Sequence, residues 1–169
     1  MSQAIRMFFM VLVFAMISII QWNLDADKTG TRNLKNALEL AVHDASLALD
    51  ESQLGQGLIV FDQVQAETNF QNSLMYHLNV NDSYEPQSAS FFQDTIDVKV
   101  LTFIDDSTID PNNPSTTVTF PYVYTNATYD VVDILYGPSV IAVVETKSPR
   151  YFSGEKAVLR QAAVYEYFN

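Results

Sequence analysis

The N-terminal segment constrains this chain more than any other part of its sequence. Residues 7–20 (MFFMVLVFAMISII) form an apolar run without a charged residue, and the chain continues from it, without a proline, into an amphipathic stretch that ends near Asp50. As a helix the run measures about 21 Å, and Ala4, Ile5 and Trp22 extend it toward the roughly 30 Å of a bilayer's hydrocarbon core. Such a chain places its first helix either in a bilayer or in the core of an assembly.

Three interpretations of this segment are open: a membrane or assembly helix, a cleaved signal peptide, or a buried helix of a soluble core. The exit SIIQWNLDAD lacks the pair of small residues that ordinary cleavage requires. Long apolar side chains on every face argue against a soluble core helix. We therefore expect an assembly helix, whose contact residues are Arg6, Met7, Phe8, Phe9, Val11, Leu12, Phe14, Ile17, Ile20 and Trp22.

Charged residues on either side of the run bear on its orientation and its partners. Arg6 precedes the run, and several basic residues follow it. Because long domains are translocated largely regardless of such charges, we expect the following domain to lie outside the cell. In an apolar core Arg6 requires a carboxylate or backbone partner, and Asp25 and Asp27 of a neighbouring copy are the carboxylate candidates within the first helix.

Beyond the apolar run, the helix is expected to continue as an amphipathic helix to about residue 50. Gly30 is the one helix breaker in this part of the chain, so a kink or a brief interruption is expected there. Further on, apolar residues recur at spacings of three and four, which places them on one face. This narrow, alanine-rich face is expected to pack on a sheet or another helix through Leu34, Leu38, Ala41, Ala45 and Leu49.

The remainder of the chain predicts a second helix and then strands. Asp62 begins a capping pair with Gln65, and apolar residues at a spacing of four predict a helix over 63–78. A short strand is expected at 58–61, and 129–136 is ambiguous between a strand and a short helix. The strand-like patterns cover 95–104, 116–124, 140–146 and 156–168.

This order of elements predicts an α+β fold. A long N-terminal hydrophobic helix continues into an amphipathic helix and packs, with a second helix, on an antiparallel sheet of about four strands. The chain then divides into an N-terminal helical part, residues 1–50, and an acidic globular α+β domain, residues 51–169.

Charge and cysteine content exclude several classes of function. The net charge is −11, from 20 acidic and 9 basic residues, and no Lys or Arg occurs between residues 36 and 98. Such a surface repels phosphate backbones, so no nucleic-acid partner is expected. The absence of cysteine excludes disulfides and thiolate metal sites, and no cofactor is expected.

The sequence contains no catalytic signature. His43 and His77 are the only histidines, and no G-x-S-x-G nucleophile elbow accompanies them, so we expect a protein that is not an enzyme. A loop at 105–115 gathers hard oxygen ligands without the spacing of an EF-hand, and its DPNNP segment is ordinary turn chemistry. We expect no metal site, with one calcium candidate set: Asp105, Asp106, Asp110 and Asn112.

The order of these elements resembles the type IV pilin-like architecture, including the small pilin-like proteins of tight-adherence systems. The resemblance rests on residues 4–20, on residues 34–49 and on the order of elements across the chain. The segments GPSVIAVVETKSPRYF and RQAAVYEYF also look like those of small membrane-anchored surface proteins of Gram-positive bacteria. Two features depart from type IV pilins: position five is Ile5 rather than Glu, and no glycine precedes the apolar run.

The resemblance implies a structural subunit of a bacterial surface filament. Its partners would be copies of itself in a helical homo-oligomer, the membrane before assembly, and a pilus or secretion assembly machinery. One alternative is a membrane-anchored accessory component of such an apparatus. A third is an extracytoplasmic ligand-binding domain.

Overall fold

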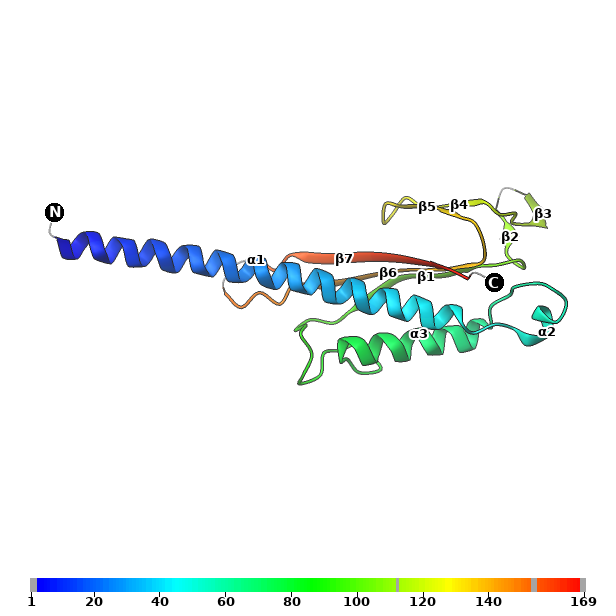
Figure 1. Cartoon of the computed structure of the whole chain (residues 1–169), viewed down its shortest axis with the longest axis horizontal. Coiled ribbons are helices and arrows are strands. Elements are labelled where there is room, and N and C mark those ends of the chain that lie inside the picture. The colour runs from blue at the N-terminus through cyan, green and yellow to red at the C-terminus, as the bar shows by residue number, and fades with distance from the viewer. Residues whose placement is uncertain (1–2, 112, 153–154, 168–169) are drawn as a thin grey trace.

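The computed structural model describes residues 3–111, 113–152 and 155–167. Figure 1 shows that the N-terminal half of the first helix projects away from the rest of the molecule, whereas its second half lies along the sheet. The elements, in chain order, are α1 (Gln3–Ser46), α2 (Glu51–Leu54), α3 (Gln63–Leu78), β1 (Asp97–Ile104), β2 (Ile109–Asp110), β3 (Asn113–Thr117), β4 (Tyr122–Asn126), β5 (Val131–Leu135), β6 (Ser139–Lys147) and β7 (Val158–Glu166). The predicted α+β class is confirmed.

Helix α1 runs without interruption for 44 residues, about 66 Å at the rise of an α-helix. The expected kink at Gly30 is absent, because this glycine is buried within the helix where the sheet approaches most closely. A Cβ atom on Gly30 would lie 2.8 Å from Cδ1 of Leu159 on β7. The Thr31 hydroxyl donates to the Asp27 carbonyl one turn earlier, at 2.8 Å, so this threonine does not cap a new helix. The glycine serves close packing and does not break the helix.

The main sheet contains three antiparallel strands in the order β1-β6-β7. Its central strand, β6, pairs with β7 from Ser139 opposite Glu166 to Lys147 opposite Val158. Nearly all of β6 is buried, because both faces of the strand are covered. The side chains of Val140, Ala142 and Val144 belong to the core beneath the helices.

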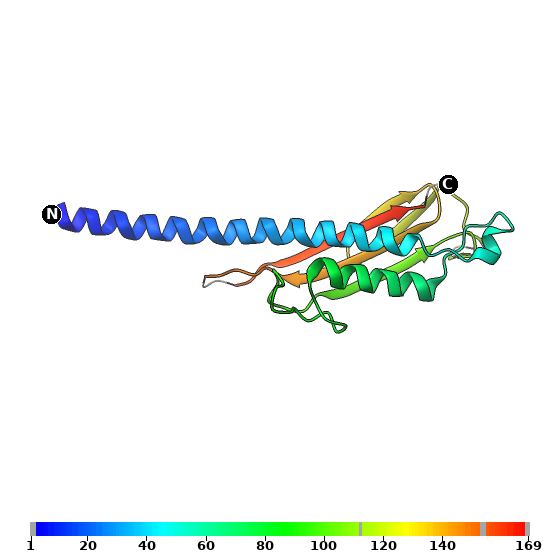
Figure 2. The same cartoon turned by 60° about the horizontal axis from the view of Figure 1, so that its bottom comes forward.

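Helices and a hairpin cover opposite faces of this sheet. Figure 2 shows α1 and α3 side by side over one face. On the other face, Ile141 packs with Leu135, Val118 and Ile104 in a smaller cluster beneath the β4–β5 hairpin. The molecule therefore has three layers, with β6 in the middle one.

The expected sheet of about four strands differs from the structure in its second member, because the first, third and fourth form the main sheet as β1, β6 and β7. The stretch 116–124 is divided, because β3 ends at Thr117 and β4 begins at Tyr122, after Pro121. These two strands pair outside the main sheet, in the separate β2–β3 and β4–β5 hairpins. The ambiguous stretch 129–136 contains strand β5.

The segment before α3 also differs from expectation. No strand forms at 58–61, where Phe61 makes only an isolated bridge with Leu49, and the short helix α2 was not anticipated. Helix α3 begins and ends where the periodicity places it. Its cap is confirmed, since the Asp62 carboxylate accepts a hydrogen bond from the Gln65 N–H at 3.1 Å.

The second half of α1 is part of the domain's core. Its small residues let α3 and β7 approach closely, and its leucines fill the space between them. Of the predicted packing residues, Leu34, Leu38, Ala41 and Ala45 are fully buried, and Leu49 is half-buried just beyond the end of the helix.

Candidate assembly helix and its collar

The first half of α1, here called the tail (residues 3–24), presents apolar side chains to solvent on all sides. Phe14 near its middle is 73% exposed, and the first buried residue of the helix is Ala26. Within the described residues, α1 is the one helix long and apolar enough to cross a membrane, a property that membrane anchors share with signal sequences. All the predicted contact residues are exposed: Arg6, Met7, Phe8, Phe9, Val11, Leu12, Phe14, Ile17, Ile20 and Trp22.

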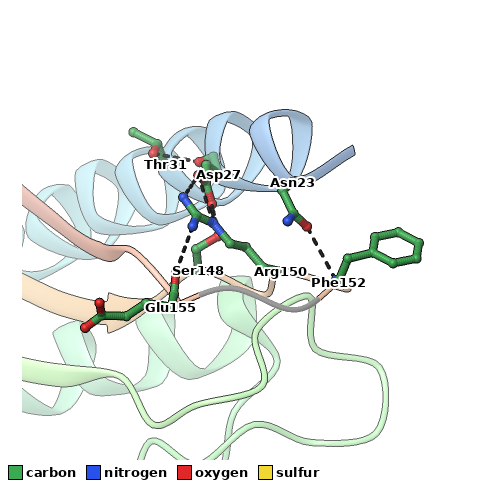
Figure 3. Close-up of polar contacts among 7 residues, drawn as sticks. All are labelled: Asn23, Asp27, Thr31, Ser148, Arg150, Phe152 and Glu155. Atoms are coloured by element: carbon green, nitrogen blue, oxygen red, sulfur yellow. Dashed lines mark hydrogen bonds and ion pairs between the residues drawn. The ribbon is translucent and has the colours of Figure 1, made fainter. Parts of the chain in front are cut away.

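A polar contact fastens the domain to the helix at the point where the tail emerges (Figure 3). Arg150, in the connection between β6 and β7, donates from Nε to Oδ1 of Asp27 at 2.9 Å and from Nη2 to Oδ2. The Ser148 hydroxyl donates to the same carboxylate. The remaining guanidinium nitrogen, Nη1, donates to the Glu155 carbonyl at 2.7 Å. The fork of Arg150 thus holds both ends of its own loop against α1.

Aromatic rings extend this contact toward the tail. Trp22 stacks on Phe152 with 5.4 Å between the ring centroids and 20° between the planes. The Phe152 N–H donates to Oδ1 of Asn23 at 3.4 Å. We call this contact, made by Trp22, Asn23 and Asp27 of α1 with Ser148, Arg150 and Phe152 of the loop, the collar.

The collar changes the ionisation of Asp27, which lies beyond the tail. Hydrogen bonds from the Arg150 guanidinium, aided by the Ser148 hydroxyl, hold the pKa of the Asp27 carboxyl below its usual value, although burial acts in the opposite direction. The side chains of both partners are about three-quarters shielded or more, so water screens the pair only in part. The ion pair therefore stabilises the folded state while Asp27 is ionised.

We expect Asp27→Asn to lower the free energy of unfolding by about 1–3 kcal/mol at neutral pH, because it removes a charge-assisted hydrogen-bond pair. The depressed pKa means that this contribution is present above about pH 4, the ordinary carboxyl value, and is lost as the pH falls through the lower folded value. The two proteins should therefore converge in stability at low pH. Thermal unfolding of the full chain in nonionic detergent across this pH range measures the difference.

Glu39→Gln is the matched control for this prediction. Glu39 pairs with Lys35 on the same helix, and both side chains are more than half exposed. Its loss should change the stability by less than about 0.5 kcal/mol. Equal losses in the two variants, or an Asp27→Asn deficit that persists unchanged in acid, would contradict the assigned role of the collar.

The partnership between Arg6 and a carboxylate of a neighbouring copy stays a prediction, and Asp27 is the less available of its two candidates. Arg150 and Ser148 of the same chain already occupy its carboxylate. Asp25, two residues earlier, is exposed. Asp25 is therefore the more accessible of the two candidate carboxylates for Arg6.

Two of the four calcium candidates, Asp105 and Asp106, accept hydrogen bonds from the backbone of residues 59–61. The buried Asp105 carboxylate accepts from the Phe61 N–H at 3.0 Å and from the Ser107 N–H at 3.0 Å, and Asp106 accepts from the Ile59 N–H at 2.8 Å. Asn112 lies outside the described residues. Among the described residues, no group of three or more His, Cys, Asp or Glu side chains is arranged to hold a metal ion.

The histidines make separate local contacts. His43 packs edge-on against Tyr165 and has Nδ1 3.2 Å from Oδ1 of Asp44, whereas His77 packs against Tyr76. His77 lies one turn after Ser73 on α3, and both side chains line a shallow surface hollow together with Asp44.

The loop side of the collar was missed by sequence reasoning, which interpreted SPRYFSGE only as a connection. The available signal was an arginine flanked by aromatic residues in an otherwise acidic domain. Comparison of the chain with protein-family models, with curated proteins and with solved structures found no match. The most distinctive feature of the molecule is thus a long apolar N-terminal helix that the collar fastens to an α+β domain.

Proposed function

We propose that this chain is a pilin-like structural subunit that assembles into a surface filament through its tail. One observation carries the proposal: a single continuous helix is apolar and exposed over its first half and buries one face in its own domain over its second half. The domain cannot cover the tail, because the tail projects away from it (Figure 1). Other molecules must therefore cover it, and copies of this chain carry the matching surface.

The energetics favour burial of the tail. Packing it among other tails removes on the order of 1,000 Å² of apolar area per subunit, worth about 25 kcal/mol before entropic costs. Contacts between unlike faces of neighbouring tails build an open helical filament when the rotation from one copy to the next does not close into a ring. Parallel tails then form a filament core, and the acidic domains surround it.

The collar supports a tail that stays attached after export. Cleavage of a signal peptide near residue 22 would separate Trp22 from its partner Phe152 and leave Asn23 at a new terminus. The helix also passes through this region without an extended stretch for a peptidase to bind.

The length of the tail favours a second candidate, a membrane-anchored accessory component of a pilus or secretion apparatus. Residues 3–22 measure about 30 Å as a helix, close to the thickness of a bilayer's hydrocarbon core. In that role the chain would span the membrane as a monomer or a small oligomer. A subunit awaiting assembly would occupy the same position.

Electron microscopy of material sheared from cells that express the full chain tests the proposal. We expect filaments whose subunit has the intact mass of the uncleaved chain. Because the chain contains no cysteine, Val11→Cys places a single thiol in the tail, and oxidation should cross-link copies within filaments. Val123→Cys, at a similarly exposed valine on β4, is the matched control in the domain. Uniform micelle-bound monomers without tail cross-links would support the accessory component instead.

A further inference from the structure

The end of the tail lies at a fixed distance from its start, because both belong to one continuous helix. Trp22 lies 19 residues beyond Gln3 on one continuous helix, a distance of about 28 Å along the axis. This matches the roughly 30 Å hydrocarbon core of a bilayer. When the start of the tail lies at one membrane surface, Trp22 lies at the other, where amphipathic aromatic rings are enriched.

The collar brings a second segment of the chain, the loop between β6 and β7, to the same position along the axis of α1 as Trp22. Phe152 stacks on Trp22, and its N–H is bonded to Asn23, a residue 129 positions away in the sequence. Tyr151 is its immediate neighbour in the loop. Figure 3 shows that the loop reaches α1 close to where the tail ends. Aromatic side chains from two distant parts of the chain therefore lie where the helix leaves the domain.

These rings take little part in the domain's core. Trp22, Tyr151 and Phe152 are 57%, 63% and 37% exposed. Lys28, also exposed, follows Trp22 by about 9 Å along α1, so its long side chain can reach the level of headgroup phosphates. Moving along α1 away from the tail, the aromatic rings come first and the cation follows. A bilayer has its layers in the same order, with the interfacial layer first and the headgroup phosphates beyond it.

We propose that Trp22, Tyr151 and Phe152 form a second membrane contact, which seats the tail-proximal end of the domain in the interfacial layer of a phospholipid bilayer. This inference rests on the membrane-inserted stage of the proposed function and goes beyond it. A single membrane helix would leave the domain free to rotate about the axis of that helix, whereas a second contact would not. Arg150 fastens the loop to Asp27, so the loop and the helix meet the bilayer as one body. The contact fixes the height of the domain above the membrane and which side faces the lipid.

Tryptophan fluorescence tests the contact directly, because Trp22 is the only tryptophan in the chain. The full chain is reconstituted in phosphatidylcholine vesicles whose acyl chains carry bromine either near the headgroup or near the chain end. Bromine near the headgroup should quench Trp22 more strongly than bromine near the chain end. The probe is then moved to the loop as Tyr151→Trp in a Trp22→Phe background.

Tyr136→Trp in the same background is the matched control. Tyr136 is 69% exposed and follows β5, near the start of β6, whereas the collar loop follows the end of that strand. The two probes are thus separated by about 26 Å of strand. Tryptophan at 151 should emit at shorter wavelength in vesicles and be quenched by bromine near the headgroup. Tryptophan at 136 should keep the emission of a water-exposed ring.

Three results would overturn the inference. Emission from position 151 that matches position 136 would show that the loop stays in water. A shift at 151 that grows with protein density and is not quenched by brominated lipid would place the loop against a second copy. Absence of quenching at Trp22 itself would show that the tail does not insert, in which case the membrane-inserted stage of the proposed function fails as well. Should Trp22→Phe fail to fold, Trp22→Tyr supplies the background.

Discussion

Replacing Phe14 with aspartate is expected to remove the chain from both membrane and filament while its domain stays folded. Phe14 lies near the middle of the tail and is among its most exposed side chains. An aspartate at the centre of a membrane helix costs about 2.5–3.5 kcal/mol, and the lost phenylalanine adds a few tenths more. One charge should therefore lower membrane partitioning by about a hundredfold or more. In a filament core, where every tail carries the substitution, the unpaired carboxylates oppose assembly along its whole length.

Flotation of membranes and electron microscopy of the sheared fraction measure these two losses. Circular dichroism in detergent should give the wild-type unfolding temperature, because the tail makes no contribution to the domain's core. Phe14→Leu, which keeps an apolar side chain of similar helix preference, should retain both anchoring and filaments. Wild-type amounts of filament from the aspartate variant would show that the tail is not the assembly element.

Leu38→Ala is expected to produce the largest loss of stability, about 2–5 kcal/mol. Leu38 is fully buried where α1 packs on the sheet, so its truncation removes contacts and leaves a cavity that the surrounding α-helices and strands can fill only in part. A loss of this size is a large fraction of the 5–15 kcal/mol that stabilises an ordinary domain. Because α1 joins the tail to the domain, the same change loosens the connection between them.

Leu40→Ala provides the matched control for this substitution. Leu40 belongs to the same helix and has the same side chain, but it is 44% exposed. Its truncation should cost less than about 1 kcal/mol. Urea unfolding of the full chain in nonionic detergent, followed by circular dichroism, compares the two variants. Similar losses would mean that the buried face of α1 does not hold the helix to the domain.

The parts of the fold that depend on local sequence could be predicted. The spacing of apolar residues specifies the bounds of α3 and the buried face of α1, and the Asp62 cap depends on residues three positions apart. The run in β6 marks a central strand, because a strand buried on both faces needs apolar residues at every position. Each of these patterns is complete within a few turns or one strand.

The parts of the fold that depend on contacts between distant residues could not be predicted from the sequence. Whether Gly30 breaks a helix or admits a neighbouring strand depends on Leu159, which lies far along the chain. The collar joins Asp27 to Arg150, 123 residues apart, and no periodicity connects them. The division of the expected sheet into one three-stranded sheet and two hairpins is likewise decided by packing between layers, around Leu135 and Ile141.

The uninterrupted course of α1 has a mechanical consequence. With no hinge between tail and domain, a pull on the tail runs along the helix axis and loads its contacts with β7 and α3 in shear, so many contacts share the force at once. The contacts of the collar, from the Trp22–Phe152 stack to the Arg150–Asp27 ion pair, stand first in this load path, at the point where the helix enters the domain. A chain under tension would thus lose the contacts of the collar before the shared contacts of its core opened.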